Sequence, residues 1–471
     1  MKSMQWICAP RRGLASFVLR ALACLAAVQG GCLHSAPPRP DILVVTIDTL
    51  RSDHCSCYGY PIGTTPNLDA LAGSGVRYNT AYSETSTTAP SHAVLMTGRH
   101  FRSFGLTKNG GILPDDSVTL AERLKDAGYA TAAFVSSFPL MSRFGFSQGF
   151  EKFDDAFTSD EASLGRRKPG EAAHDRYAGA TFEHFQRWFD DFHDARPLFV
   201  WVHFVDPHAP YHAPEKFDAQ WPDGTSGAIQ RYDGEVHYAD EQLGRVLGLF
   251  RSRATDRGQL IVVTSDHGEG LGDHGWMSHG INLYEEAVRV PLVASWPGHL
   301  AAARVVDEPV ALIDVAPGIL DSLSLEAGSF THGRKLFGAT DSARQVFLQR
   351  RDYKSSSEGG QKIRGEMSAV VANGSKLILA PGENRREFYD LATDPHELVD
   401  LLGGGPANDR ERAAAAAAPP ARLTKAEAEA GATRLDGLLR QWHKQYPAAL
   451  RSHAAPDKET QKALRSLGYI E

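Results

Sequence analysis

The first candidate for chemistry is Thr88, which lies two positions before Pro90 in a segment whose apolar run ends at Gly98. Proline is favoured at the first position of a helix, so the segment predicts a helix that begins near Pro90 and ends near Gly98. Thr88 would then lie beside unpaired backbone N–H groups at the positive end of this helix, a place that favours an alkoxide and a bound anion. Taken alone, the pattern is typical of a threonine that caps a helix.

Acids and histidines also follow three predicted buried strands, at the point where each strand ends. They are Asp48 after strand 41–46, Asp206 and His208 after strand 198–204, and Asp266 and His267 after strand 260–264. If the strands are parallel, their carboxyl ends meet at one edge of a sheet, where ligands bind in open α/β sheets. Carboxylates, an imidazole and a hydroxyl can hold a divalent metal ion, which would turn Thr88 into a nucleophile at neutral pH. Each residue alone would be an ordinary polar group at a strand end, and their common location favours a site.

The elements that must position these residues alternate between strand and helix. Further strands are expected at 76–82, 130–135 and 290–295, and helices at 65–71, 117–127, 176–193, 229–250 and 312–323. This alternation predicts an α/β fold with a mixed, mostly parallel sheet flanked by helices on both faces. We expect a catalytic domain over residues 41–340.

The alternation of predicted strands and helices ends near Arg344. Short strands at 345–348, 367–371, 375–379 and 387–391 predict a small antiparallel sheet in a subdomain over residues 341–402. The segment 352–366 is expected to be a pocket-shaping loop. An Ala/Gly/Pro-rich tract predicts a linker over residues 403–422, and a helix at 423–446 begins a helical tail that runs to residue 471.

The first forty residues differ from the rest of the chain. Lys2, Arg11 and Arg12 precede an apolar run at 14–28, which is followed by two glycines and Cys32. This pattern predicts a secretion signal over residues 1–31, with Cys32 as a lipoprotein cysteine and residues 32–40 as a tether. The arginine pair alternatively indicates twin-arginine export. We therefore expect an exported protein, periplasmic or on the outer cell surface, whose contact with a membrane is a lipid anchor at Cys32.

The composition argues against nucleic-acid binding and against a fold held together by disulfides. The 471-residue chain has a net charge of -7, which argues against a broad basic surface for nucleic acid. Only Cys55 and Cys57 lie outside the leader, and they are too close in sequence to pair easily, so no disulfide framework is expected. Two thiols are favoured over a metal site for this pair.

The chain resembles the sulfatase family of the alkaline phosphatase superfamily, and the resemblance covers about residues 40–402. The matching motifs are 48–53 with 58–59, 65–69, 88–92 with 97–98, 208–211, 265–269 with 274–275, 283–285, 289–292, and 388–391 with 394–395. The resemblance implies an alkaline-phosphatase-like fold and a metal held by Asp48, Asp266, His267 and Thr88. A histidine ligand favours zinc or manganese, and the family favours calcium.

The departures from the family pattern affect the expected chemistry. Typical sulfatases convert a cysteine or serine at the position of Thr88 to formylglycine, which a threonine cannot form. Thr49 stands in place of a second acidic ligand, His92 in place of an arginine, and His279 in place of a lysine. Ser-Ser-Phe at 136–138 replaces a lysine and a histidine.

An unmodified threonine on a metal resembles nucleotide pyrophosphatase/phosphodiesterases and lipoteichoic acid synthases. The former group implies that Asn109 donates to the oxygens of the transferred group, although Asn109 could equally form a turn with Gly110. His92 is a further catalytic candidate. His208 and His279 are expected near the leaving oxygen, where one of them protonates it; alternatively they bind a second metal together with Asp206.

Three functions compete at this point. The first is hydrolysis of sulfuric esters by an unmodified threonine. The second is hydrolysis of phosphodiesters or phosphonate monoesters, or transfer of a phospho-group, with a small-molecule, glycan or lipid ester as substrate. The third is a non-catalytic binding protein, against which the retained set of Asp48, Thr88, Asp266 and His267 argues.

Overall fold

The computed structural model describes residues 39–158, 175–218, 227–253, 255–326, 328, 332–338, 341, 343–358, 360–404, 409–417, 420–449 and 457–466. The expected signal peptide, Cys32 and residues 32–38 of the tether lie outside these ranges. Within them, no helix combines the length and the apolar character that crossing a bilayer requires.

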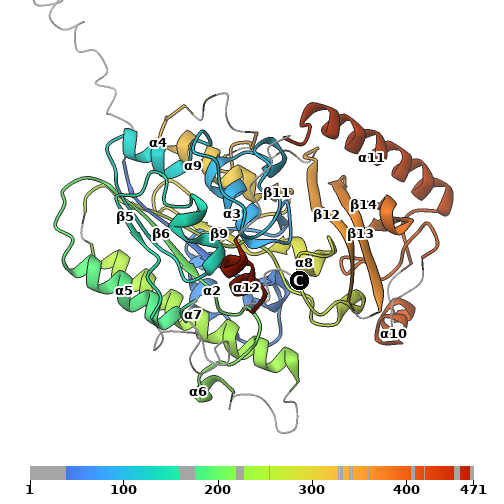
Figure 1. Cartoon of the computed structure of the whole chain (residues 1–471), viewed down its shortest axis with the longest axis horizontal. Coiled ribbons are helices and arrows are strands. Elements are labelled where there is room, and N and C mark those ends of the chain that lie inside the picture. The colour runs from blue at the N-terminus through green and yellow to red at the C-terminus, as the bar shows by residue number, and fades with distance from the viewer. Residues whose placement is uncertain are drawn as a thin grey trace, which may run out of the picture. The chain divides into compact units, whose positions relative to one another are not determined.

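An eight-stranded sheet forms the centre of the main domain (Figure 1). In spatial order its strands are β10 (Arg304–Val306), β2 (Val76–Tyr78), β9 (Leu292–Ser295), β7 (Gln259–Ser265), β1 (Asp41–Ile47), β6 (Leu198–Phe204), β4 (Ala130–Phe134) and β5 (Lys152–Asp154). β9 runs antiparallel to both β2 and β7, and the other pairs are parallel. The predicted mixed, mostly parallel sheet is confirmed.

The register of β1 explains how distant residues meet. Ile47 at the end of β1 lies opposite Phe204 of β6 on one side and Ser265 of β7 on the other. Asp48 and Asp266 therefore leave the sheet at the same edge, as expected for the carboxyl ends of parallel strands.

Helices cover both faces of this sheet, so β1 is buried on both sides. Leu43, Val45 and Ile47 pack with one set of helices, and Ile42 and Val44 pack with another. The first set is α2 (Pro66–Gly73), α5 (Ala178–Asp190) and α7 (Ala228–Ser252). The second set is α3 (Thr88–Thr97), α4 (Leu120–Asp126) and α9 (Val315–Ser322).

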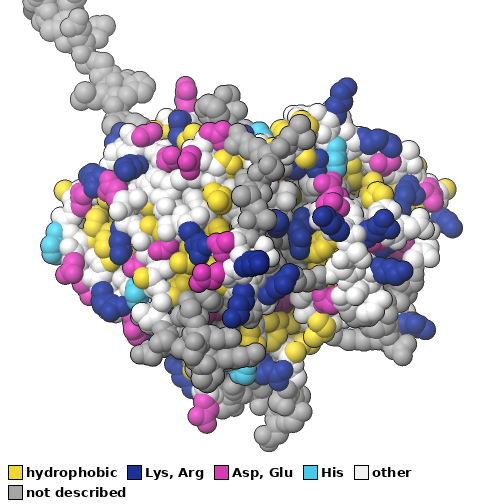
Figure 2. Space-filling view, in the orientation of Figure 1, with side chains coloured by type: hydrophobic (Ala, Val, Ile, Leu, Met, Phe, Trp, Pro, Cys, Tyr) yellow, Lys and Arg dark blue, Asp and Glu magenta, His cyan; other side chains and the backbone are white. Residues whose placement is uncertain are grey.

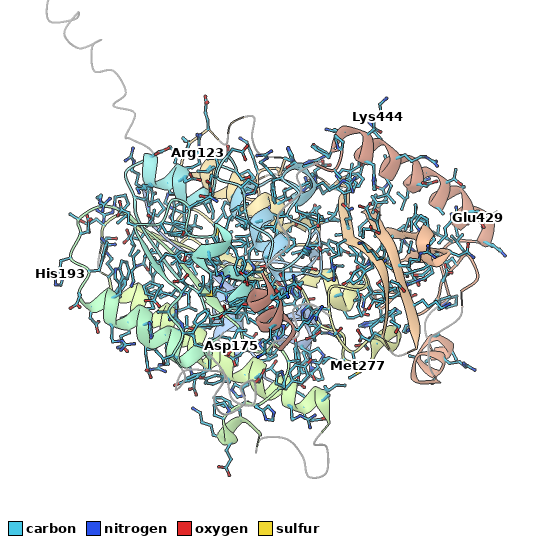
Figure 3. The ribbon with its side chains drawn as sticks, viewed as in Figure 1. Arg123, Asp175, His193, Met277, Glu429 and Lys444 are labelled. Carbon is cyan, nitrogen blue, oxygen red and sulfur yellow. The ribbon has the colours of Figure 1, made fainter. Side chains whose placement is uncertain are left out.

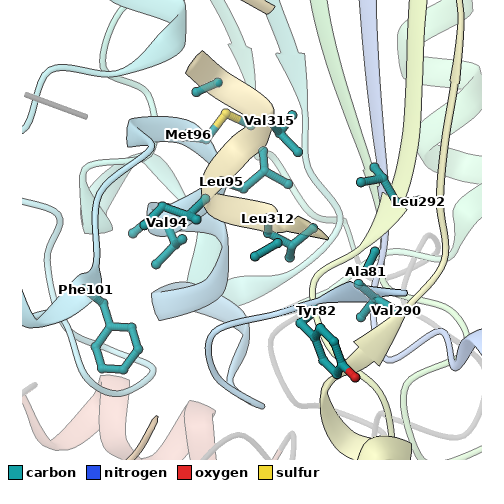
Figure 4. Close-up of a cluster of buried hydrophobic side chains, with 14 of the residues drawn as sticks. Ala81, Tyr82, Val94, Leu95, Met96, Phe101, Val290, Leu292, Leu312 and Val315 are labelled. Atoms are coloured by element: carbon teal, nitrogen blue, oxygen red, sulfur yellow. The ribbon is translucent and has the colours of Figure 1, made fainter. Parts of the chain in front are cut away.

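Helix α3 begins two residues earlier than the sequence predicted. Thr87 is its N-cap residue, Thr88 its first residue, and Gly98 ends it with a left-handed φ of 62°. Pro90 lies inside the first turn, where the backbone N–H groups have no intrahelical partner and proline is tolerated. Apolar side chains of α3 pack against Leu312 and Val315, which begin the segment leading into α9 (Figure 4).

Two predicted strands are each divided in the structure. The stretch 76–82 gives β2 and then β3 (Ala81–Tyr82), and the stretch 290–295 gives β8 (Arg289–Val290) and β9, separated by Pro291. β3 and β8 form a second, three-stranded sheet with β11 (Val310–Ala311). Pro291 has no N–H for a ladder hydrogen bond, which fits its place at the break.

The C-terminal sheet is antiparallel, as predicted, with strands β12 (Val346–Glu358), β13 (Gln361–Ala372), β14 (Ser375–Ala380) and β15 (Arg385–Asp390). Helix α11 (Lys425–Gln445) packs on it through Leu435, Leu439 and Trp442 (Figure 1). The expectation of a loop at 352–366 is wrong, because these residues extend β12 and β13 into a long hairpin with register shifts. The tract expected to be a linker contains helix α10 (Asp409–Ala417). Short helices α6 (Glu215–Asp218), α8 (Glu285–Val288) and α12 (Lys458–Ser466) complete the described α-helices.

A buried ion group joins this sheet to the main domain. The ammonium of Lys376 on β14 lies 3.0 Å from Glu285 Oε1 and 2.9 Å from Glu397 Oε1, and it has no exposed surface. The two carboxylates raise the pKa of Lys376 in spite of burial, which by itself would lower it. The lysine therefore stays charged and offsets part of the cost of burying the two acids, although burial still raises the pKa of Glu397 to about 8.

Replacing this lysine should destabilise the protein strongly. Lys376→Met leaves Glu285 and Glu397 without their cation, and such losses cost about 3–5 kcal/mol of unfolding free energy. Urea denaturation followed by fluorescence measures the change. Lys362→Met, at an exposed position of β13, is the matched control and should stay within ~0.5 kcal/mol. Equal stability of the two variants would contradict this role.

Candidate metal and nucleophile site

Four polar side chains meet at the carboxyl edge of β1 and β7. Ligand atoms of Asp48, Asp266 and His267 all lie within 4.8 Å of one another, and all three side chains are fully buried. His267 Nε2 lies 3.7 Å from Asp48 Oδ1, 3.4 Å from Asp266 Oδ2 and 3.3 Å from Thr88 Oγ1. The structure thus brings the four residues of the expected metal set together, from elements up to about two hundred positions apart.

The tautomer of His267 follows from its backbone contact. Nδ1 lies 2.8 Å from the carbonyl oxygen of Gly268, which can only accept, so Nδ1 carries the proton. Burial, and next the charge of His279, lower the pKa of His267 well below its ordinary value, so the ring stays neutral. Nε2 therefore presents a lone pair to the two carboxylates and the hydroxyl, as a metal-binding imidazole does.

The donor set fits a divalent metal ion. Ligands at zinc bond lengths of about 2.0–2.2 Å in a tetrahedron lie roughly 3.3–3.6 Å apart, and the separations from His267 Nε2 are 3.3, 3.4 and 3.7 Å. In the protein alone, burial raises the pKa of Asp266 well above its usual range, and this effect exceeds that of the backbone N–H groups of Thr49 and His267, which donate to Oδ1. A cation at this point would restore the ionised form.

Thr49, where the family resemblance expects a second acidic ligand, has a structural role at the backbone. Its φ of 55° lies in the left-handed region that β-branched residues rarely adopt. This conformation directs its N–H to Asp266 Oδ1 at 3.3 Å and its carbonyl to the hydroxyl of Tyr232 at 2.8 Å. Such a conformation costs about 1–3 kcal/mol, and strain of this kind concentrates at functional sites.

His92 holds the first turn of α3 to the sheet. Its Nδ1 lies 2.8 Å from the carbonyl of Thr88, and its Nε2 lies 3.1 Å from Thr46 Oγ1, which also accepts from Trp201 Nε1 at 3.0 Å. Both ring nitrogens are therefore engaged, and burial lowers the pKa of His92 to about 4. Its geometry is that of a positioning residue, with Nδ1 3.6 Å from Asp266 Oδ2.

Asn109 lies at the start of the same helix. Its Oδ1 accepts from the backbone N–H of Ala89 at 2.8 Å, which occupies one orphan donor of α3. Its Nδ2 is buried and has no hydrogen-bond partner among the described residues. Because a buried donor without a partner costs free energy, this amide is suited to a group that arrives with a substrate.

Two further histidines lie beside His267. The ring of His279 is 4.6 Å from that of His267 and 4.9 Å from that of His208. Burial would lower the pKa of His279, but the Glu269 carboxylate, 3.1 Å from Nδ1, raises it above its ordinary value. His208 Nδ1 lies 2.7 Å from the carbonyl of Ala209, so a proton on this nitrogen leaves Nε2 as an acceptor. His279 is thus the better proton donor of the two.

The carboxylate of Asp206 binds a backbone N–H group, whereas a two-metal site would require it to bind an ion together with His208 and His279. Its Oδ2 accepts from the backbone N–H of Ala178 at 2.7 Å, which places the carboxylate at the first turn of α5. Among the described residues, the metal-compatible group of three or more comprises Asp48, Asp266 and His267, without Asp206, His208 or His279.

Sequence reasoning missed His203, the sixth residue of β6. Its Nε2 lies 3.9 Å from Asp48 Oδ2, and its ring lies 5.0 Å from that of His92. The residue is fully buried, and Nε2 has no hydrogen-bond partner among the described residues. Its signal in the sequence was a single histidine inside an otherwise apolar strand, next to a ligand-bearing strand in the sheet.

Known proteins share both the fold and the motifs. The Sulfatase family model matches residues 40–325, and the model for the C-terminal part of N-sulphoglucosamine sulphohydrolase matches residues 272–412. The fold and the buried acid and histidine group define an enzyme of the alkaline phosphatase superfamily. Within it, the chain belongs to the sulfatase family, whose members use a divalent metal, and it is a hydrolase of sulfuric or phosphoric ester bonds.

Individual relatives are distant. The chain is 26% identical to the uncharacterized sulfatase YidJ of Escherichia coli over 77% of its own length and 83% of that protein. It is 28% identical to the N-acetylgalactosamine-6-sulfatase of Sus scrofa, over 62% and 64% of the two lengths. The phosphonate monoester hydrolase of Agrobacterium radiobacter superposes with a TM-score of 0.66 at 20% identity, covering 87% of this chain and 96% of that one. This likeness confirms the expected alkaline-phosphatase-like fold.

Metal binding should be measurable through stability. After treatment with a chelator, added Zn²⁺ or Mn²⁺ should raise the melting temperature, because a ligand at a hundred times its Kd stabilises the folded state by about 2.7 kcal/mol. His267→Ala should lose this response and the bound metal, measured by elemental analysis. His193→Ala, at an exposed position (Figure 3), should keep both. A metal response that survives in His267→Ala would contradict the ligand assignment.

Proposed function

We propose that this protein is a metal-dependent hydrolase of sulfuric esters that uses unmodified Thr88 as its nucleophile. The observation that carries the proposal is the 3.3 Å contact of Thr88 Oγ1 with the lone-pair nitrogen of His267, beside two buried carboxylates. Thr88, Asp48, Asp266 and His267 would hold the ion. Zinc or manganese suits a set that includes an imidazole, and calcium suits the family.

The residues divide the reaction between them. When bound, the metal supplies Lewis-acid stabilisation of the threonine alkoxide and of the transferred group's oxygens. Thr88 Oγ1 forms a bond to sulfur as the ester oxygen leaves, and Asn109 Nδ2 donates to an oxygen of the transferred group. The leaving oxygen takes a proton from Nε2–H of His279, while Glu269 holds the other side of that ring. Water then attacks the same sulfur and gives a proton back to Nε2 of His279, while the bond from sulfur to Thr88 Oγ1 breaks and inorganic sulfate leaves.

Hydrolysis of phosphodiesters or phosphonate monoesters is the second candidate. The threonine itself favours it, since formylglycine is the device that suits release of sulfate and is absent here. Structural likeness to phosphonate monoester hydrolases agrees with this candidate. A glycan ester is a suitable substrate class for either reaction, since related structures hold D-glucosamine-2-N,6-O-disulfate and a neocarrahexaose.

The expected place of action is the periplasm or the outer cell surface. The leader at 1–31 and Cys32 support this part of the proposal. Labelling of the full chain with a radioactive fatty acid, and loss of label in Cys32→Ala, would test the anchor.

The nucleophile can be tested by substitution. Thr88→Ala removes the attacking oxygen and should lower kcat at least ~10³-fold, whereas Thr88→Ser should retain turnover. Both variants are assayed with an aryl sulfate, an aryl phosphodiester and an aryl phosphonate monoester in the presence of Zn²⁺, Mn²⁺ or Ca²⁺. The preferred ester decides between the two candidate functions. Full activity of Thr88→Ala would rule out this nucleophile.

Asn109 gives an independent test of the transition-state contact. Asn109→Ala removes the Nδ2 donor and should lower kcat by about 10²–10³-fold, as loss of one oxyanion donor does elsewhere. Steady-state kinetics should place the loss in kcat rather than in KM. Asn109→Asp, which keeps the acceptor for Ala89 N–H but not the donor, should lose activity to a similar extent. Normal kcat in Asn109→Asp would assign Asn109 to the turn alone.

A further inference from the structure

The loop that carries His279 is bound on both sides of that residue by the β12–β13 hairpin. Before His279, Glu358 Oε1 accepts from the N–H of Met277 at 2.8 Å, and Glu358 Oε2 accepts from Ser278 Oγ at 2.7 Å. After it, the hydroxyl of Tyr353 donates to the carbonyl of Gly280 at 3.0 Å. His279 is left with its side chain directed to Glu269 and the neighbouring histidines.

The hairpin is itself fixed within the C-terminal sheet. Arg350 is buried, lies 2.7 Å from Glu383 Oε1 and donates to the carbonyl of Gly365 at 2.8 Å. The same guanidinium donates to the carbonyl of Ile281 at 2.9 Å. Gln361, across the hairpin, donates to the carbonyl of His274 at 3.1 Å. The loop therefore takes its position from residues of another sheet, with polar contacts at both of its ends.

The loop has little burial of its own on its outer side. Met277 is 55% exposed and projects from the lower part of the molecule (Figure 3). Gly280 has a φ of 79°, so the turn after His279 depends on a conformation available mainly to glycine. Without the hairpin, few apolar contacts would hold the main chain at residues 277–280 in one arrangement.

We propose that the β12–β13 hairpin positions His279 for catalysis, with Tyr353 and Glu358 as the positioning residues. This inference rests on the proposed function of His279 as the donor to the leaving oxygen. Neither residue touches the metal and nucleophile group. Both bind the residues on either side of His279, and the Glu358 carboxylate in addition helps to raise the pKa of His279. The small C-terminal sheet thereby becomes part of the active site of the main domain, although its residues contribute no group to the reaction.

Displacement of His279 should slow the hydrolysis of some esters more than others. A catalytic group displaced by about 1 Å can lose 10²-fold in rate. The loss should appear with esters whose leaving alcohol needs a proton, and it should be small with nitrophenyl esters, whose leaving group departs as an anion. A merely structural role would lower activity towards both kinds of ester equally.

The experiment compares Glu358→Ala, Tyr353→Phe and the double variant with the wild-type chain. With a series of aryl and alkyl esters of increasing leaving-group pKa, kcat/KM should fall about 10- to 100-fold at the high end and less than about threefold at the low end. Glu358→Gln, which retains an acceptor for Met277 N–H, should recover most of the loss. Ser357→Ala, at an exposed neighbouring position of the hairpin, is the matched control and should match the wild type. Equal losses across the series, or none, would overturn the proposal.

A second measurement separates this inference from the proposed function. Hydrogen exchange of the amides at 277–281 should quicken in Glu358→Ala and Tyr353→Phe and stay unchanged in Ser357→Ala, whatever ester the protein hydrolyses. If no ester is turned over but exchange quickens, the proposed function fails and the positioning of the loop stands. If exchange stays slow in both variants, the hairpin does not position His279.

Discussion

The candidate site brings the oxygen and nitrogen lone pairs of four buried side chains close together, away from solvent. Two carboxylates, a neutral imidazole nitrogen and a hydroxyl oxygen meet within hydrogen-bond and ion-pair distances, and none of them is exposed. Burying two anions side by side is strongly unfavourable unless a cation lies between them. The upward pKa shift of Asp266 reflects the same constraint. A divalent metal ion held by Asp48, Asp266 and His267 would therefore stabilise this arrangement, and Thr88 Oγ1 would lie beside it.

The fold supports that arrangement through the backbone rather than through more charges. Parallel register places Asp48 and Asp266 at one sheet edge, and the strained backbone of Thr49 aims an N–H at Asp266. A hydrogen-bonded row from Trp201 through Thr46 to His92 fixes the first turn of α3, where Thr88 begins the helix. Each contact is modest alone, and together they hold the backbone of Thr88 in one position, which the proposed reaction requires.

Sequence patterns predicted the strands and helices that carry the site, but they predicted fewer of the side-chain contacts around it. Buried strands ending in acids, together with alternating helices, gave the parallel sheet and the meeting of Asp48, Thr88, Asp266 and His267. The start of α3 was misplaced because proline is tolerated throughout a first turn. Residues 352–366 have no apolar alternation, and they form strands because the pairing of β12 with β13 and the contacts to 277–281 stabilise them. His203 was missed because a histidine within a strand shows its neighbours only once the sheet is assembled.

The replacements around Thr88 remove charges of both signs, because Thr49 stands where the family has an acidic metal ligand and His92 where it has an arginine. Where typical sulfatases have an arginine, this chain has His92, whose pKa of about 4 keeps it neutral, and Ser136 and Ser137 stand near the place of a lysine and a histidine. A divalent ion would balance Asp48 and Asp266, and Glu269 balances a protonated His279. The lost arginine lowers the positive charge near the substrate and the lost acidic ligand raises it, so these two replacements offset each other. Sulfate esters, phosphodiesters and phosphonate monoesters each carry a single negative charge, whereas a phosphate monoester carries nearly two. The two candidate reactions of the proposed function therefore act on esters of the same charge.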